Sequence, residues 1–580
     1  MRARRAVAAL ALALAAAAVA GCATVPAESP VQVVRRVTGG EDGAPPAGPA
    51  AGIDFLSVVR EFVQRSASST DRHAAARQYL LDPQSDWDDA ASVTVLESSS
   101  ESSFDTVPLG PDPDTGGERV RIRGVALGRL SSSGAFEPDQ RRIETEVVVQ
   151  RSPAGQWRIA ELDPGVLVPL DEFELQYRSV RSWFVDPARQ VVVADRRYIP
   201  LYPQAAQASR VLDALLAGPS TSLLGAATST LQQARPRSNV GVGETGELVV
   251  DLTEVGELDP AGRGLLAAQV VLALDEVGVR RVRLTVDGVA LLPDRPVLGR
   301  DDVAALTAGS EPGADVPALV AAGGRLQQLS PGAGTSELTG PAGNGAYDVE
   351  SGASTADGQR LAVVARAGGA RFLLLGGGAD GGVAEVGLSA GTMTRPTWTP
   401  TGSEVWTVLN GATVARVSTG GAGAPVDGQV NAEELVAFGP IEDLRLSRDG
   451  VRVAAVVGGG LYTGAVTRSI DGEVAIRGVR RLRSLDLTEV TSADWRSGDT
   501  IVVTTARTGR GVAEVSVDGL QLTLRPVTNL TSPLGAVAAA PNRPLLVTDA
   551  SGVWSFGGGQ QDAWRQVLGG AQDAVAAYPG

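Results

Sequence analysis

The chain has 580 residues, 43% of them hydrophobic, and a formal net charge of −15. This length exceeds what one hydrophobic core usually serves, so we expect several domains. The acidic balance argues against nucleic acid as a partner and against electrostatic attraction to anionic lipid, since both need a basic surface. A single cysteine excludes disulfides within the chain and a cysteine-ligated zinc site, and we expect no metal and no cofactor.

The first residues have the pattern of a secretory signal. Arg2, Arg4 and Arg5 precede an Ala/Leu/Val run over 6–20, which is too short to span a bilayer comfortably. We therefore expect a signal peptide over 1–21, whose removal leaves a mature chain exported across the cytoplasmic membrane.

The sole cysteine stands directly behind this apolar run. Residues 19–22 follow the order aliphatic, small, small, cysteine, which resembles the lipobox of bacterial lipoproteins. The lipobox residues are Val19, Ala20 and Gly21, and the lipidation site is Cys22. The resemblance implies a diacylglyceryl group on the sulfur and often an acyl chain such as palmitate on the new amino terminus, and two chains make a stable membrane anchor. A cysteine in an ordinary signal peptide or a short buried helix is the alternative.

Residues 22–51 are rich in Pro, Gly and Ala and hold few large apolar side chains, which is typical of a tether. At roughly 3 Å per extended residue, such a segment holds the first domain tens of ångströms from the bilayer. On the lipoprotein interpretation, the protein is therefore anchored to the cell membrane on its extracytoplasmic face.

A first globular unit is expected over 52–168. Apolar residues at helical spacing predict a helix over 52–65, and an alanine-rich pattern predicts a second over 71–81, ended by Pro83. Alternating apolar and polar residues then predict strands. These strands cover 93–96, 119–130, 143–150 and 157–162. Helices followed by a curved antiparallel sheet resemble the NTF2-like cone, and no acid–base pair stands out in its strands, which favours a binding or spacer role.

Few residues of this unit are candidates for catalysis or metal binding. His73, the only histidine, lies in the alanine-rich pattern, where we expect it on the helix surface; a Ser-His-Asp triad around it is the alternative. The acidic run Asp112-Pro113-Asp114 is flanked by Pro and Gly and is expected at a hairpin tip rather than in a calcium site. We therefore expect a protein that is not an enzyme.

A second unit is expected over 175–300. Two strands, 183–186 and 191–200, precede a helix over 207–216 that ends at Gly218-Pro219. A strand, a helix and a strand follow over 248–252, 264–274 and 282–288. Through its segments 215–219, 249–252 and 286–288, this unit resembles the GerMN domain first described in spore germination proteins. The resemblance implies an extracytoplasmic α/β module for binding or assembly and transfers no catalytic residue.

From 316 the chain changes to short apolar strands with many glycines. A turn followed by an apolar strand recurs, most clearly at 446–456, and the turn residues are 44 to 48 residues apart. These turn residues are Gly358, Gly402, Gly450, Gly498 and Asn542. The period is the length of a four-stranded propeller blade with a tight turn between its two inner strands. A chance arrangement of hairpins in a sandwich is the alternative.

The repeat also predicts how the ring closes. Residues 573–580 begin a further copy that stops where its inner turn should be, and 317–329 supply the missing strands. One blade built from both segments pairs edges that would otherwise be open. We therefore predict a six-bladed β-propeller over 316–580. Four tryptophans recur beside the repeat turns, where packing of the blades is favoured over ligand platforms; they are Trp398, Trp406, Trp495 and Trp554.

The expected fold class is thus a multidomain chain that combines α+β units with an all-β propeller. A lipobox, a Pro/Gly-rich tether, an NTF2-like unit, a GerMN unit and a propeller, in this order, resemble the LpqB family of actinobacterial lipoproteins. The resemblance implies a membrane-anchored accessory of an MtrA/MtrB-type two-component system, which binds the extracellular domain of the sensor kinase and affects cell wall and division. An extracytoplasmic propeller hydrolase and a binder of cell-wall polymer are alternatives.

Overall fold

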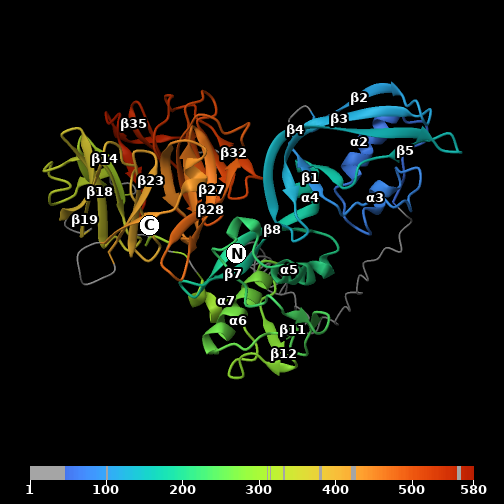
Figure 1. Ribbon diagram of the computed structural model, residues 1–580, viewed down its shortest axis with the longest axis horizontal. Helices are drawn as coiled ribbons and strands as arrows, with labels where there is room; N and C mark the ends of the chain where they lie inside the picture. Colours follow the sequence, from blue (N-terminus) through green and yellow to red (C-terminus); the bar gives the residue numbers. More distant parts are fainter. Residues whose placement is uncertain are drawn as a thin grey trace, which may run out of the picture. The chain divides into compact units, whose positions relative to one another are not determined.

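The computed structural model describes residues 46–98, 102–307, 309, 311–313, 315–330, 334–377, 382–419, 426–557 and 563–580. The expected signal peptide, the lipobox with Cys22 and most of the tether lie outside these residues. Gly48–Gly580 form one unit by their contacts. Three sheet-rich regions follow one another along it (Figure 1), and we call them the cone, the middle domain and the propeller.

The cone is a curved sheet against which helix α2 (Phe55–Arg65) packs. The strand order is β5-β4-β3-β1-β6, with β2 also paired to β3; β1 and β6 are parallel and the other pairs antiparallel. The strands are β1 (Val93–Leu96), β2 (Phe104–Pro111), β3 (Glu118–Leu130), β4 (Phe136–Arg151), β5 (Trp157–Glu161) and β6 (Val166–Pro169). Asp54 caps α2 by accepting hydrogen bonds from the amides of Leu56 and Ser57. Val59 and Phe62 of α2 are buried in the core.

The predicted second helix over 71–81 is wrong. Only α3 (Ala74–Arg77) is helical, because residues 71–73 have left-handed backbone φ angles between 48° and 57°. His73 is buried rather than on a helix surface, and its Nδ1 lies 2.9 Å from the carbonyl oxygen of Ser66. Burial lowers the pKa of His73. A core position next to a backbone carbonyl is a structural role for this histidine.

The other corrections in the cone concern its sheet. Strand β2 was not expected, and β4 begins before the predicted residue 143. The turn between β2 and β3 carries Asp112-Pro113-Asp114, as predicted for a hairpin tip. There the carboxylate of Asp112 accepts hydrogen bonds from the backbone amide and hydroxyl of Thr115, so it stabilises the turn.

The middle domain begins after α4 (Leu170–Gln176) with the hairpin of β7 (Tyr177–Asp186) and β8 (Val191–Pro200). Helix α5 (Gln207–Leu216) follows, as predicted, and α6 (Pro260–Asp275) packs on β7 and α5. A second sheet has the order β10-β11-β12-β13, with β9 paired to β11. The remaining bounds are β9 (Arg235–Pro236), β10 (Gly241–Val242), β11 (Leu248–Thr253), β12 (Val282–Val286), β13 (Val289–Ala290) and α7 (Arg300–Val303). The strand, helix and strand of the GerMN resemblance are thus present.

The described residues of the propeller form six four-stranded sheets, the number that the repeat predicts. The first holds β14 (Ala318–Ala322), β15 (Arg325–Ser330), β16 (Gly334–Glu337) and β37 (Val575–Ala577); the second β17 (Asp348–Ser354), β18 (Arg360–Ala367), β19 (Ala370–Gly377) and β20 (Val383–Ala390). The third holds β21 (Thr397–Trp398), β22 (Glu404–Leu409), β23 (Thr413–Ser418) and β24 (Val426–Val430); the fourth β25 (Ile441–Leu446), β26 (Arg452–Val457), β27 (Gly460–Arg468) and β28 (Val474–Leu482). The fifth holds β29 (Val490–Ser497), β30 (Thr500–Thr505), β31 (Val512–Ser516) and β32 (Leu522–Arg525); the sixth β33 (Val537–Ala538), β34 (Leu545–Asp549), β35 (Gly552–Phe556) and β36 (Arg565–Gly569). A short helix, α8 (Glu433–Val436), lies between the third and fourth sheets.

The first sheet closes as the sequence predicts. Strand β37 pairs antiparallel with β14, so that Leu319 lies opposite Ala577 and Ala321 opposite Val575. The amide of Gly580 donates to the carbonyl oxygen of Ser354 in the second sheet at 2.9 Å. The edge of β14 is therefore covered by a strand from the other end of the domain.

The tryptophans beside the repeat turns pack between sheets, as expected. The indole nitrogens of Trp398 and Trp495 donate to the carbonyl oxygens of Ala353 and Arg445 in the preceding sheets, both at 3.1 Å. Trp406 is also buried, whereas Trp554 is half-buried. The interpretation of these residues as packing residues is thus confirmed for the three buried ones.

Candidate functional site

The clearest copy of the repeat is the place where the propeller meets the hairpin β7–β8. Val451, which follows the turn residue Gly450, belongs to the same buried hydrophobic cluster as Val185 and Val192 of the hairpin. The guanidinium of Arg189 at the hairpin tip donates to the carbonyl oxygen of Asp449. One turn of the fourth sheet is therefore buried in the core of the middle domain, and we call this contact the seam.

A buried ion pair reinforces the seam. Arg452 pairs with Asp449 at 2.9 Å and donates to the carbonyl oxygen of Ala194 in β8 at 2.6 Å. Both charged side chains are almost fully buried. Burying a charge is costly unless it is paired and hydrogen-bonded, so this arrangement is specific to the docked geometry.

A turn of the fifth sheet docks on the cone in the same way. Leu520, between β31 and β32, lies in the hydrophobic cluster of the cone together with Phe173 and Tyr198. The hydroxyl of Tyr198 donates to a carboxylate oxygen of Asp518 at 2.9 Å. Burial, with the nearby Asp518, raises the pKa of Tyr198 well above its usual value, so this hydroxyl keeps its proton.

Arg197 joins the cone to the middle domain. Its side chain is fully buried and donates to the hydroxyl of Ser133 at 2.6 Å and to the carbonyl oxygen of Gly218 at 2.7 Å. It also pairs with Asp195 at 2.8 Å. The three regions are thus joined pairwise by buried polar and apolar contacts, which favours a preformed surface over independently moving modules.

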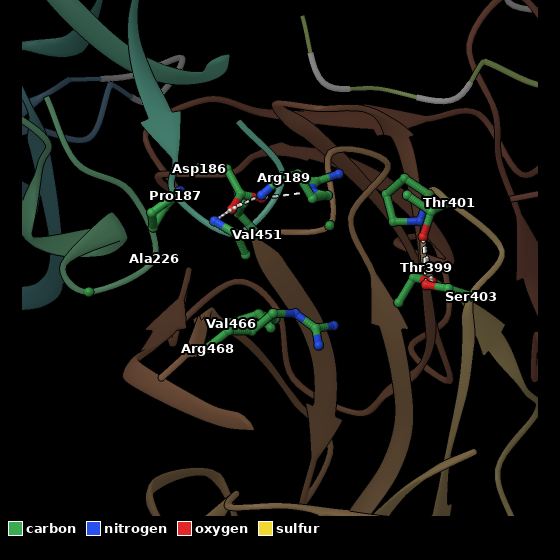
Figure 2. A pocket seen from close by; sticks show the side chains of 14 residues that line it. Asp186, Pro187, Arg189, Ala226, Thr399, Thr401, Ser403, Val451, Val466 and Arg468 are labelled. Carbon is green, nitrogen blue, oxygen red and sulfur yellow. Dashed lines mark hydrogen bonds and ion pairs between the residues drawn. The ribbon is translucent and has the colours of Figure 1, made fainter. Parts of the chain in front are cut away.

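A pocket of about 400 Å³ lies beside the seam (Figure 2). Its walls come from the hairpin tip, from the loop at Gly225 and Ala226, and from the third and fourth sheets. The view shows Arg468 below the Asp186–Arg189 pair, with its side chain extending toward the side on which three hydroxyl side chains lie. These three are Thr399, Thr401 and Ser403. This is the size of ordinary small-molecule sites in proteins.

The carboxylates beside this pocket already have partners. Glu404, which follows the lining residue Ser403, accepts hydrogen bonds from Arg468, Arg416 and the indole of Trp406. Burial by itself raises the pKa of Glu404. The hydrogen bonds from Arg468 and the other donors outweigh burial and hold the pKa below its usual value. The carboxylate of Asp186 accepts from the amide of Ala188 and from Arg189.

Two further buried carboxylates lie where the innermost strands of the propeller converge. Asp443 pairs with Arg395 at 3.0 Å and Asp494 with Arg445 at 3.3 Å. Arg395 also donates to the carbonyl oxygen of Val537 at 2.6 Å, which links a further sheet. Burial by itself raises the pKa of Asp494, but the surrounding guanidinium groups outweigh burial and lower it.

These pairs bear on the hydrolase alternative. A catalytic acid needs a raised pKa and access to substrate. Asp443 and Asp494 instead hold arginines that tie sheets together, which is a structural use of the ring's centre.

The cone contains a second pocket, of about 250 Å³. Phe62, Ile122, Val147 and Val166 contribute apolar wall, and Arg129 is one of the charged side chains around it. In this pocket the hydroxyl of Thr145 donates to Asp163 at 2.6 Å. The prediction that the cone is a binding or spacer unit is compatible with such a cavity and is not tested by it.

The lipidation site and lipobox predicted from the sequence lie outside the described residues. Among the residues that the structure does describe, no group of three or more His, Cys, Asp or Glu side chains is placed to hold a metal ion. No helix in that part of the chain is both long and apolar enough to cross a membrane. Sequence analysis missed the seam, its pocket and the buried arginines, because a charged residue in a strand is normally assigned to the solvent face.

Three family models match the three regions in the same order along the chain. The family model described as "Lipoprotein LpqB, N-terminal domain" matches residues 48–174, "Sporulation and spore germination" matches 182–292, and "Lipoprotein LpqB beta-propeller domain" matches 324–579. Among solved structures, a putative TolB from Agrobacterium tumefaciens is similar over 40% of this chain and 84% of that chain, with 16% identity and a TM-score of 0.27.

Whole-length relatives extend the match. Lipoprotein LpqB of Rhodococcus opacus (strain B4) is 32% identical, over 98% of this chain and 97% of that protein. Lipoprotein LpqB of Mycolicibacterium smegmatis is also 32% identical, over 92% of each chain. Fold and matches together define a multidomain, sheet-rich lipoprotein with a β-propeller, and none of these descriptions is that of an enzyme. The chain belongs to the lipoprotein LpqB family.

Proposed function

We propose that the protein is anchored by lipid on Cys22 at the extracytoplasmic face of the cell membrane and binds the extracellular domain of a two-component sensor kinase of the MtrA/MtrB type, with effects on cell wall and division. The observation that carries a binding role is the docking of two propeller turns in the cores of the cone and the middle domain. Docking of this kind presents several modules as one preformed surface, which lowers the entropic cost of binding a protein partner.

The anchor supplies the physical mechanism. Both partners lie in one membrane, so a weak contact gains a high effective concentration. The lipoprotein shifts the conformational equilibrium of the kinase only if it binds one kinase state more tightly than the other. We propose no catalytic step, because Asp443 and Asp494, the buried carboxylates at the centre of the ring, are each held by an arginine.

Anchoring is tested by Cys22→Ser in the native organism, with Ser29→Ala in the tether as the matched control. We expect Cys22→Ser to move the protein out of the membrane fraction and to abolish its effect on kinase signalling, with an unchanged circular dichroism spectrum and melting temperature. Signalling that persists in full when the protein has been released would refute the proposal, and mass spectrometry of the mature amino terminus checks the lipid directly.

The partner is tested by crosslinking in cells and by pull-down. The full chain is mixed in parallel with the purified extracellular domain of the kinase and with peptidoglycan. Retention by the kinase domain supports the proposal, whereas retention by peptidoglycan alone supports the alternative of a cell-wall-polymer binder. Hydrolysis of a fluorogenic glycan or peptide substrate, seen as release of its fluorophore, would instead favour the hydrolase.

A further inference from the structure

The seam pocket has more hydrogen-bond donors than acceptors to offer a ligand. An ionised carboxylate can accept about four hydrogen bonds, and Glu404 accepts four, from Arg416, Arg468 and an indole. Asp186 accepts three, two of them from Arg189. The acceptor capacity of both acids is therefore largely used within the protein.

The donors are less fully used. A guanidinium has five N–H donors, and Arg468 spends two of them on Glu404, which leaves three without a hydrogen bond to the described part of the chain. Its side chain is about one third exposed at the pocket wall. The hydroxyls of Thr401 and Ser403 bond each other at 2.7 Å, and the only other hydroxyl of the described residues in reach, that of Thr399, is 3.5 Å from each. A ligand oxygen at a shorter distance can therefore compete for the remaining proton of the pair.

The charge points the same way. Arg416 and Arg468 share the single carboxylate of Glu404, so this group carries one net positive charge. On the facing wall Arg189 and Asp186 balance each other. The pocket is thus locally cationic in a protein whose formal net charge is −15, and an anion is attracted to it more strongly than to its surroundings.

The rest of the lining is small or apolar. Val451 and Val466 are buried beneath the pocket, and Pro187 and Pro400 stand at its sides. An organic group fits against this surface better than a hydrated inorganic ion does, because it removes apolar area from water. A ligand seated here touches both the middle domain and the propeller.

From donors, charge and lining together, we propose that the seam pocket binds a small organic carboxylate, with Arg468 as the main ligand of the carboxylate group and one hydroxyl of the Thr401–Ser403 pair as donor to a neighbouring oxygen. A ligand that contacts both sides of the seam also strengthens their contact, by the linkage between binding and stability. This inference does not depend on the proposed kinase partner.

The test is isothermal titration of the full chain, with Cys22→Ser so that it carries no lipid. Three carboxylates are each compared with their neutral counterpart: D-glucuronate with D-glucose, D-lactate with D-lactamide, and N-acetyl-D-alanine with its amide. We expect saturable binding of at least one carboxylate, and binding of its counterpart at least about tenfold weaker, the scale of a charged hydrogen bond. If none of the three acids binds, or if acid and counterpart bind equally, the proposal is overturned.

Variants locate the site. Arg468→Gln is expected to weaken binding about tenfold or more, and the milder Thr401→Val, at an exposed hydroxyl, about two- to tenfold. Arg477→Gln in β28 removes the same charge from the same sheet outside the pocket and is expected to leave the dissociation constant unchanged. An equal loss in Arg468→Gln and Arg477→Gln would show that net charge alone attracts the ligand and would overturn the assignment. Melting temperatures of all variants, with and without ligand, separate loss of the site from loss of the fold.

Discussion

The guanidinium of Arg452 donates a 2.6 Å hydrogen bond to the carbonyl oxygen of Ala194, although the two residues are 258 positions apart in the sequence. Arg452 opens the second strand of a propeller sheet, and Ala194 lies in the hairpin of the middle domain. Arg452 also neutralises the buried Asp449. One side chain therefore stabilises both the turn of the fourth sheet and the contact between this sheet and the middle domain.

Loss of Arg452 should therefore destabilise the protein strongly. Arg452→Met leaves Asp449 buried without its cation, and breaking a buried pair in this way costs about 3–5 kcal/mol. The control is Arg366→Met, whose pair with Asp348 is about half exposed and contributes less than about 1 kcal/mol. The measurement is the midpoint of urea unfolding. Similar shifts for the two variants would contradict the role given to the seam.

Leu520 should be essential for docking of the cone. It is 1% exposed, so Leu520→Ala leaves a cavity between propeller and cone and costs about 2–5 kcal/mol. Leu524 in the following strand is 42% exposed, and Leu524→Ala is expected to change stability by about 0.5 kcal/mol or less. Hydrogen exchange followed by mass spectrometry should show faster exchange around Phe173 and Tyr198 in the first variant only. Unchanged exchange there would argue that the cone does not need this contact.

The indole hydrogen bond between propeller sheets can be removed with little change in shape. Trp398→Phe loses the donor to the carbonyl oxygen of Ala353 and part of a buried ring, which we expect to cost about 1–3 kcal/mol. Trp554→Phe is the matched control, since Trp554 is half-buried and its indole nitrogen donates to the hydroxyl of Ser551, in the turn before its own strand. Thermal unfolding should give Trp398→Phe a clearly lower melting temperature than Trp554→Phe. The reverse order of melting temperatures would contradict the packing role of Trp398 and favour a role as a ligand platform.

Glu247 should make the protein sensitive to acid. The hydroxyl of Thr245, the backbone amide of Glu247 itself and Arg283 hydrogen-bond its carboxylate and lower the pKa from 4.5 to about 2. A depressed pKa in the folded state stabilises the fold above pH 4.5, and this stabilisation is lost as the pH falls from 4.5 toward 2. Melting temperature against pH should therefore decline less steeply in this range for Glu247→Gln than for the wild type. The exposed Glu257→Gln should follow the wild type, and a Glu247→Gln curve parallel to the wild type would disprove the assignment.

The parts of the fold that were predicted are those in which local pattern and tertiary structure agree. Helix α5 (Gln207–Leu216) and strand β8 (Val191–Pro200) have the predicted bounds, because each carries a clear apolar period and is ended by proline or glycine. The turn glycines Gly358, Gly402 and Gly450 have positive φ angles of 66° to 72°, which is why their spacing marked the sheets so reliably.

The predictions failed where distant contacts decide. The second helix was lost because residues 71–73 leave the helical region and Arg77 turns inward to pair with Asp89 at 2.8 Å. Strand β2 contains Pro108 and Gly110, which weaken a strand pattern. Antiparallel pairing with β3 holds this segment in a strand although its own sequence does not favour one.

The candidate site was harder to predict than the fold. The segment at 446–456 was recognised as the clearest repeat, but one sequence does not reveal that Val451 leaves its own sheet to join another domain's core. Arg468 and Glu404 have no apolar periodicity that marks them as partners, and they are 64 residues apart. Only the packing of two sheets and a hairpin brings such residues together.

The pairing of β37 with β14 imposes an order of events on biogenesis. Strand β14 is made before the rest of the propeller, and its partner β37 is made only after the strands of the other five sheets. Until then the nascent protein carries an open strand edge, which other chains can capture. A chain cut short before β37 therefore keeps the edge of β14 open, and we expect such a product to aggregate or to be degraded.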